Sequence, residues 1–249
     1  MRIVVFGGTG LIGSQVVSLL TMAGHETIAQ SPETGVNTVT GQGVAAAVAG
    51  ADVVVDVTNS PSFALNDVMR FFQMSTANLL AEEKTAGVRH HVALSIVGAD
   101  RSPDSTYLPG KVAQEKLIAL SGVPWTVVRA TQFYEFLGAI ADAATDGDTV
   151  RIAPVAFQPM ASADVARAIA EAAVSAPVNG PIETAGPERR RFDDVIRQAL
   201  AARGDRRQVV ADPDARYFGQ PLADGTIVPL GDFRPGRIRL ADWLAAQTR

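Results

Sequence analysis

A glycine-rich segment near the start of the chain constrains the fold more than any other feature. Residues 7–13 read GGTGLIG and satisfy both G-x-x-G-x-x-G and G-x-G-x-x-G. They lie between a β-branched run, residues 2–6, and a segment with helical spacing of apolar residues, 11–23. Glycine permits a tight turn there, and free N–H groups at a helix start attract a pyrophosphate. The segment predicts a dinucleotide-binding turn whose cofactor contacts come from Gly7, Thr9, Gly10, Leu11, Ile12 and Gly13.

The end of the second predicted strand bears on which dinucleotide is bound. NAD recognition normally uses an acidic side chain there, whereas NADP recognition needs a donor or a cation. The chain offers Gln30 and Ser31 at this point, with Glu33 two residues further on. Ser31 could donate to a 2′-phosphate, so NADP (NADPH) is the preferred cofactor and NAD is the alternative. Ser31 as an ordinary turn residue is the competing interpretation.

Strand and helix patterns alternate along the first 130 residues. Parallel strands need crossovers, which usually carry helices, so the alternation predicts an α/β fold with a doubly wound parallel sheet (a Rossmann fold). We expect a dinucleotide-binding domain over residues 1–150 and a small C-terminal α+β substrate-binding lobe, residues 151–249, packed on the same core. The predicted strands are residues 2–6, 26–29, 36–40, 52–57, 91–97 and 125–130. The predicted helices are residues 11–23, 44–49, 63–86, 110–120, 162–174, 192–203 and 240–246.

Composition argues against several classes of function. The net charge of −4 gives no electrostatic reason to bind nucleic acid or an anionic membrane. The chain has no cysteine, which excludes disulfides and thiolate nucleophiles, and its three histidines lack ligand-like spacing, so we expect no metal. Because no apolar run is long enough for a membrane span and no secretory signal pattern opens the sequence, we expect a cytoplasmic protein.

A serine, a tyrosine and a lysine form the candidate catalytic set. Ser95 lies at the end of a predicted strand, and Tyr107 and Lys111 follow it with the spacing Tyr-x-x-x-Lys at a helix start. With GGTGLIG, the segments VVVDVTN, VALSIVGAD, YLPGK and VRATQFYEF follow in order over residues 1–185. In these segments the chain resembles the short-chain dehydrogenase/reductase superfamily, in particular its atypical NmrA-like NAD(P)-binding branch.

The resemblance implies roles for these three side chains. Lys111, which also binds cofactor, and the oxidised nicotinamide would lower the pKa of the Tyr107 phenol, which would exchange a proton with a substrate oxygen. Ser95 would hold that oxygen by a hydrogen bond. The implied reaction is NAD(P)-dependent carbonyl reduction or alcohol oxidation, with reduction as the natural NADPH direction. Pro109 disfavours helical geometry before it, so we expect Tyr107 to precede the helix that contains Lys111.

Three further groups of residues are candidates for ligand contacts. Thr58 and Asn59 follow a buried strand, where an open α/β sheet binds its ligand, and we assign them to the cofactor. Gln132, Phe133 and Phe136 follow a later strand and are assigned to a small, largely apolar substrate, with Tyr134 beside them; core packing is the alternative. Residues 189–207 are rich in arginine, but neighbouring acids favour a solvated helix face over an anion site.

Two other functions compete with the reductase. One is an NmrA-like regulatory protein that binds NADP without turnover and reports its redox state to a partner. The other is a nucleotide-sugar epimerase or dehydratase, which the short C-terminal segment makes less favourable. The substrate identity and the choice between monomer and homodimer stay open at this point.

Overall fold

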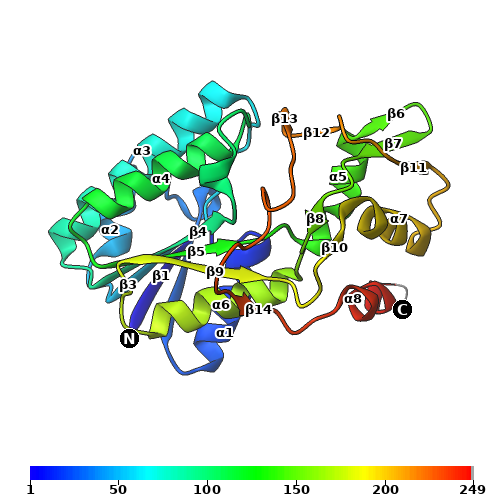
Figure 1. Ribbon diagram of the computed structural model, residues 1–249. Coiled ribbons are helices and arrows are strands. Elements are labelled where there is room, and N and C mark those ends of the chain that lie inside the picture. Colours follow the sequence, from blue (N-terminus) through cyan, green and yellow to red (C-terminus); the bar gives the residue numbers. More distant parts are fainter. Residues whose placement is uncertain (248–249) are drawn as a thin grey trace. The chain divides into compact units, whose positions relative to one another are not determined.

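The computed structural model describes residues 1–247, and its largest sheet has seven parallel strands (Figure 1). The strand order is β14-β9-β5-β4-β3-β1-β2. β1 (Arg2–Phe6) pairs with β2 (Glu26–Gln30) on one side and with β3 (Val53–Asp56) on the other. The winding direction reverses between β1 and β3, which confirms the predicted doubly wound fold. The other strands are β4 (His90–Ile96), β5 (Trp125–Ala130), β9 (Gly180–Ala185) and β14 (Arg234–Pro235).

Helices cover both faces of this sheet. In Figure 1, α2 (Val44–Val48), α3 (Leu65–Ala86) and α4 (Leu108–Leu120) lie on one face. The opposite face is covered by α1 (Leu11–Met22) and α6 (Ser162–Val174). All four residues of β3 are buried, as expected for a parallel strand between two helical layers. The predicted helices of this region are confirmed to within about two residues at each end.

The predicted strand over residues 36–40 is wrong. This segment forms a turn, in which the Asn37 side-chain oxygen accepts hydrogen bonds from the backbone N–H groups of Val39 and Thr40 at 3.0 and 3.1 Å. Asn37 and Gln42 form a single isolated antiparallel bridge. A side-chain oxygen that binds backbone donors two and three residues ahead competes with strand pairing, which explains the missing strand.

The chain forms two compact units that interleave along the sequence. The first unit comprises Met1–Ser95, Thr106–Arg129 and Val165–Ile182, and the second comprises Ile96–Ser105, Ala130–Asp164 and Glu183–Arg249. The division expected at residue 150 would give two units that are each one continuous segment, whereas the chain passes between the observed units several times. A substrate-binding role for residues 151–249 stays a prediction.

The second unit has its own hydrophobic core. Its helices are α5 (Leu137–Ala143), α7 (Phe192–Ala202) and α8 (Leu240–Gln247), and Phe157 and Phe192 stack in its core with ring centroids 4.0 Å apart. β6 (Thr145–Asp146), β7 (Thr149–Ile152) and β11 (Gln208–Ala211) form a three-stranded sheet. β8 (Ala156–Phe157) pairs with β10 (Arg190–Arg191), and β12 (Arg216–Tyr217) pairs with β13 (Gln220–Pro221). Most of these strands are too short to show a period of two in the sequence.

Within residues 1–247, no helix combines the length and the apolar character that crossing a bilayer requires.

Candidate active site

The glycine-rich turn has the geometry of a phosphate cradle. Gly7 has a φ of +78°, and a Cβ atom on it would lie 2.8 Å from the carbonyl oxygen of Val57. A Cβ atom on Gly8 would lie 2.8 Å from the Cα atom of Ala29, and one on Gly13 would lie 2.1 Å from the carbonyl oxygen of Gly7. Side chains at these three positions would therefore collide with backbone. The conformation depends on glycine where the sequence places it.

The first turn of α1 can receive an anion. Gly10 is the N-cap residue, and its own N–H donates to the carbonyl oxygen of Gly7 at 3.0 Å. The next N–H groups have no intrahelical acceptor because helix geometry supplies none to a first turn. The first turn contains no acidic side chain, and Thr9, Gly10 and Leu11 are exposed. These residues fit a dinucleotide pyrophosphate, which would meet N–H donors and the positive end of the helix dipole.

Gln30 and Ser31 are tied into a local turn at the end of β2. The Ser31 backbone N–H donates to the Thr34 hydroxyl at 2.9 Å, and the Thr34 and Gln30 side chains are hydrogen-bonded at 2.8 Å. Ser31 is buried and precedes the short 3₁₀ helix Pro32–Thr34. This geometry explains the turn and leaves the preference for NADP a prediction.

Tyr107 immediately precedes α4, as the effect of Pro109 predicts. It is the N-cap residue, and Pro109 lies in the first turn of the helix. The buried Tyr107 ring packs against Phe63, with centroids 5.8 Å apart, and edge-on against Phe72, with centroids 5.9 Å apart. Its hydroxyl donates to the side-chain oxygen of Asn59, which follows β3. The structure thus brings together Tyr107 and one predicted cofactor residue.

Lys111 lies in the first turn of α4 and is buried. Its ammonium group donates to the side-chain oxygen of Gln114 and lies 4.2 Å from the centroid of the Phe72 ring. The side-chain NH₂ of Gln114 donates to Asp56 at 2.8 Å. Asp56 ends β3, and its other oxygen accepts from the N–H and the hydroxyl of Thr58 at 2.9 and 2.6 Å. A polar chain therefore links Lys111 to the predicted cofactor residue Thr58.

Ser95 belongs to a second polar cluster. Its hydroxyl donates to Glu115 at 2.5 Å, and Arg129 binds the same carboxylate through Nε at 3.0 Å and Nη2 at 2.6 Å. The side chains of Glu115 and Arg129 are each 14% exposed, so this fork-like pair is well sheltered from water. While this bond persists, Ser95 offers lone pairs rather than a proton to an approaching group.

Burial dominates the electrostatics of Tyr107 and Lys111. Removal from water raises the pKa of the Tyr107 hydroxyl. It also lowers the pKa of Lys111 to about 8, against the opposing effect of the Asp56 and Glu115 charges. The lowering of the Tyr107 pKa by Lys111 and nicotinamide is thus not seen in the protein alone. It stays a prediction for the cofactor complex.

The predicted substrate residues Gln132, Phe133 and Phe136 lie in the second unit. Phe133 and Phe136 stack with centroids 5.6 Å apart, and Phe136 is 47% exposed. Tyr134 is instead part of the core of this unit, and its hydroxyl donates to the carbonyl oxygen of Ile238 at 3.2 Å. A side-chain oxygen of Gln132 is buried without a hydrogen-bond partner, so it can accept one. Their contact with a substrate stays a prediction.

Sequence reasoning missed several residues of the site. Phe72, Gln114 and Glu115 contact the candidate catalytic residues, and Asp56 reaches Lys111 through Gln114, but none of the four was predicted as a site residue. Asp56 is the one acid in the apolar run VVVDV, and that exception was a usable signal. Gln114 and Glu115 follow Lys111 by three and four residues, which places them beside it on a helix. Neither spacing identifies a partner on another element.

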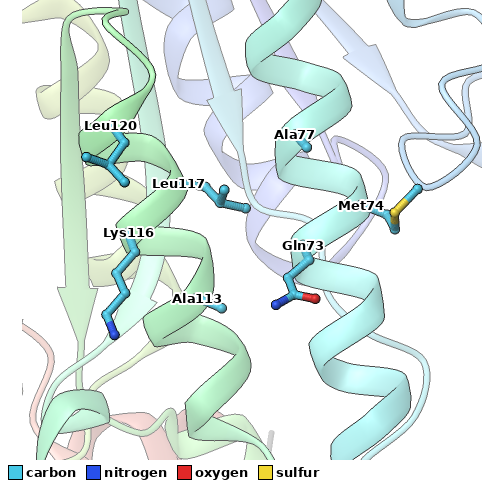
Figure 2. Close-up of a pocket in the computed structure, with 7 residues that line it drawn as sticks. All are labelled: Gln73, Met74, Ala77, Ala113, Lys116, Leu117 and Leu120. Carbon is cyan, nitrogen blue, oxygen red and sulfur yellow. The ribbon is translucent and has the colours of Figure 1, made fainter.

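Two other surfaces carry none of the predicted catalytic residues. The arginine-rich stretch is paired with acids on α7, where Arg197 contacts Asp194 at 2.6 Å and Arg191 contacts Asp193 at 3.1 Å. An open groove of about 430 Å³ lies between α3 and α4, and Figure 2 shows the side chains that line it. Its lining is mostly apolar and consists of Gln73, Met74, Ala77, Ala113, Lys116, Leu117 and Leu120. Among the described residues, no cluster of three or more His, Asp or Glu side chains could hold a metal ion.

The fold is similar to those of several solved nucleotide-binding proteins. A UDP-glucose 4-epimerase from Thermotoga maritima, with UDP-glucose, has a TM-score of 0.75 and 17% identity, covering 98% of this chain and 96% of that one. A short-chain dehydrogenase/reductase superfamily protein from Agrobacterium tumefaciens, with bound NAD, has a TM-score of 0.75 and 16% identity, covering 99% and 95%. For an NADPH-dependent quinone oxidoreductase from Escherichia coli the TM-score is 0.65 and the identity 18%, covering 85% and 78%.

Sequence comparison settles the family. Curated protein sequences give no significant match. Residues 7–176, more than half of the chain, match the model of an NAD(P)H-binding family. Together with the fold, this match confirms the resemblance to an atypical short-chain dehydrogenase/reductase. The chain belongs to the NAD(P)H-binding family.

Proposed function

We propose that this protein is an NADPH-dependent oxidoreductase that reduces a small carbonyl compound, with Tyr107 as the proton donor. The observation that carries the proposal is the bond between Tyr107 and Asn59. It places a tyrosine hydroxyl at the carboxyl end of β3, the edge at which an open α/β sheet binds its ligand. Lys111 lies one helical turn away in a chain whose glycine turn fits a dinucleotide.

The residues have separable roles in this reaction. Gly7, Gly8 and Gly13 let the backbone approach the pyrophosphate, and the first turn of α1 donates N–H groups to it. Thr58, Asn59 and the Lys111 ammonium would hold the nicotinamide end of the cofactor. NADPH, when bound, supplies the hydride that the carbonyl carbon accepts. Tyr107 gives its hydroxyl proton to the carbonyl oxygen, so the products are an alcohol and NADP⁺.

Asn59 and Glu115 already accept hydrogen bonds from the two hydroxyl groups that the substrate oxygen would need. The Tyr107 hydroxyl must leave Asn59 to reach a substrate oxygen, and the Ser95 hydroxyl must leave Glu115 to donate to it. Burial keeps Tyr107 protonated at neutral pH, and the cofactor complex would have to lower its pKa for efficient proton donation. Gln132, Phe133 and Phe136 of the second unit are assigned to the substrate, and the two rings would favour an apolar group on it.

A non-catalytic NADP-binding regulator is the second candidate. The same two hydrogen bonds support it, because both candidate hydroxyls are already engaged by acceptors within the protein. Such a protein binds NADPH and turns over nothing. The nucleotide-sugar epimerase is the third candidate, and saturable micromolar binding of UDP-glucose would favour it over the reductase.

Cofactor binding and turnover test the proposal together. Purified protein is titrated with NADPH and with NADH while nicotinamide fluorescence is recorded. Oxidation of NADPH is then followed at 340 nm with a panel of aldehydes, ketones and quinones. We expect tighter binding of NADPH and turnover of at least one panel member. Binding without any turnover favours the regulator, and failure to bind either cofactor contradicts the proposal.

A variant isolates the role of Tyr107. Tyr107→Phe removes only the hydroxyl, so we expect turnover to fall at least about 100-fold, with cofactor affinity retained. Tyr217→Phe makes the same change in the second unit and is the matched control. Unchanged turnover in Tyr107→Phe would rule out Tyr107 as the proton donor.

A further inference from the structure

The side chain of Gln114 separates two opposite charges in the first unit. On one side, its oxygen accepts a hydrogen bond from the Lys111 ammonium group. On the other side, its NH₂ donates to Asp56 Oδ2 at 2.8 Å. Gln114 is 1% exposed, and Lys111 and Asp56 are also buried, so both contacts are sheltered from bulk solvent. The three side chains come from α4 and from the end of β3.

Chemistry fixes the orientation of this amide. An ammonium group has only donors, and a carboxylate has only acceptors. If the amide were rotated by 180°, its oxygen would face the Asp56 carboxylate and its NH₂ would face Lys111. Both contacts would then be repulsive in a buried environment, where a mismatched polar contact is costly. Asp56 therefore selects the rotamer of Gln114 that presents an acceptor to Lys111.

Asp56 is itself held in place by a second set of donors. Its Oδ1 accepts from the Thr58 N–H at 2.9 Å and from the Thr58 hydroxyl at 2.6 Å. The carboxylate thus has separate partners for its two oxygens. This leaves Gln114 attached to a rigid strand end rather than to a mobile side chain. The Phe72 ring of α3 supports the ammonium group from another direction, with Nζ 4.2 Å from its centroid.

We propose that Gln114, oriented by Asp56, is a positioning residue that sets both the location and the charge state of Lys111. The charged groups that act on Lys111 are Asp56 from β3 and Glu115 from α4; α3 presents the Phe72 ring. Asp56 forms no direct ion pair with Lys111, because the Gln114 amide lies between them. The Glu115 carboxylate is instead bonded to Ser95 and Arg129. Burial lowers the pKa of Lys111 to about 8 against the effect of the Asp56 and Glu115 charges, and the hydrogen bond that Gln114 accepts favours the charged form. The consequence for cofactor binding rests on the proposed function; the effect on Lys111 does not.

The chain has only three lysines, which makes Lys111 directly observable. Lys84 and Lys116 are exposed and serve as internal references. Protein labelled with ¹³C at lysine Cε is titrated by NMR, and the Lys111 signal is assigned by its absence in Lys111→Arg. We expect the Lys111 signal to titrate with a midpoint near 8.

Variants of Gln114 then test the proposal. Gln114→Leu removes the acceptor, so the Lys111 midpoint should fall by about one pH unit or more. Gln114→Glu adds a negative charge at the same length, so the midpoint should rise. Gln73→Leu, an exposed glutamine on α3, is the matched control and should leave it unchanged. A Lys111 midpoint in Gln114→Leu equal to that of the wild type would overturn the proposal.

A second variant and an NADPH titration distinguish failure of this proposal from misfolding and from failure of the proposed function. If Gln114→Leu does not fold, Gln114→Asn retains the amide but is too short to reach both partners, and it should lower the midpoint in the same way. In the wild type, NADPH affinity should weaken about 10-fold from pH 7 to pH 9.5, and Lys111→Arg should weaken less, because arginine stays charged. If the wild type does not bind NADPH at all, the proposed function fails, and the lysine titration still decides the role of Gln114.

Discussion

The first unit buries two cationic side chains in different ways. His91 of β4 contacts Glu83 of α3 directly, with Nδ1 at 2.9 Å from both carboxylate oxygens and both side chains fully buried. Lys111 reaches Asp56 only through the Gln114 amide. Burial lowers the pKa of His91, but the Glu83 contact and the Asp56 charge outweigh it, so the net shift is upward. For Lys111 burial prevails, and its pKa falls to about 8.

The difference shows how contact distance decides the charge state of a buried group. A direct ion pair compensates the loss of hydration, so His91 holds its proton more tightly and belongs to the stable framework. An amide between the charges leaves part of that loss uncompensated, so Lys111 changes charge near physiological pH. The directly paired cation, His91 of β4, lies against Glu83 of α3, whereas the amide-bridged Lys111 lies one helical turn after Tyr107, where a change of charge can affect a ligand.

The largest effect is expected when the direct pair is broken. Glu83→Gln leaves the His91 ring buried without its carboxylate, so the free energy of unfolding should fall by about 3–5 kcal/mol. Urea denaturation at pH 6 measures it, with Glu82→Gln, on the partly exposed neighbour, as the control. A loss below about 1 kcal/mol would mean that the pair contributes no more than a surface ion pair.

The contribution of His91 should also depend on pH. Its folded pKa is raised, so its stabilisation is complete below the unfolded value of about 6.5 and is lost as the pH rises through the folded pKa. The gap in stability between the wild type and Glu83→Gln should therefore narrow above that pKa. A gap that widens with pH would contradict the raised pKa of His91.

Lys111 should give the opposite pH dependence. Between pH 8 and about 10.4 the unfolded lysine keeps a proton that the folded one has released, so stability rises with pH. The total rise is about 3 kcal/mol at most. Urea denaturation from pH 7.5 to 10.5 should show it in the wild type and in Lys116→Met, an exposed lysine on the same helix. Lys111→Met should lack it; a rise that persists there would assign the effect to other groups.

Sequence patterns predicted the parts of this site that local backbone geometry controls. The glycine turn was predictable because a strand, a tight turn and a helix start restrict the backbone within seven residues. The position of Tyr107 before α4 followed from Pro109 in the same way. The bond from Gln114 to Asp56 spans 58 positions and depends on how α4 packs against β3, which no local pattern encodes. The strand expected over residues 36–40 failed because the Asn37 side chain competes for the same backbone donors.

The Glu115–Arg129 pair is less buried than the Glu83–His91 pair and more buried than the Asp194–Arg197 pair on α7. Both side chains are 14% exposed, and the guanidinium binds the carboxylate through two nitrogens. Glu115→Gln should lower the free energy of unfolding by about 1–3 kcal/mol, because Arg129 keeps a neutral acceptor but loses its counter-charge. The measurement is urea denaturation at pH 7, with the exposed Glu171→Gln as the control. A loss as large as that of Glu83→Gln would show that direct contact between the charges, and not how deeply they are buried, sets the stabilisation.

The smallest effect is expected at the surface of α7. Asp194 and Arg197 are only 2.6 Å apart, as close as Glu115 and Arg129, but their side chains are 45% and 49% exposed. Water already solvates both charges, so Asp194→Asn should change the free energy of unfolding by less than about 1 kcal/mol. Added salt at about 1 M should abolish that change, since it shortens the screening length to about 3 Å. The effect of Glu83→Gln should resist the same salt, because ions do not enter the core. Equal salt sensitivity of the two variants would mean that separation alone, and not shelter from water, sets the strength of these pairs.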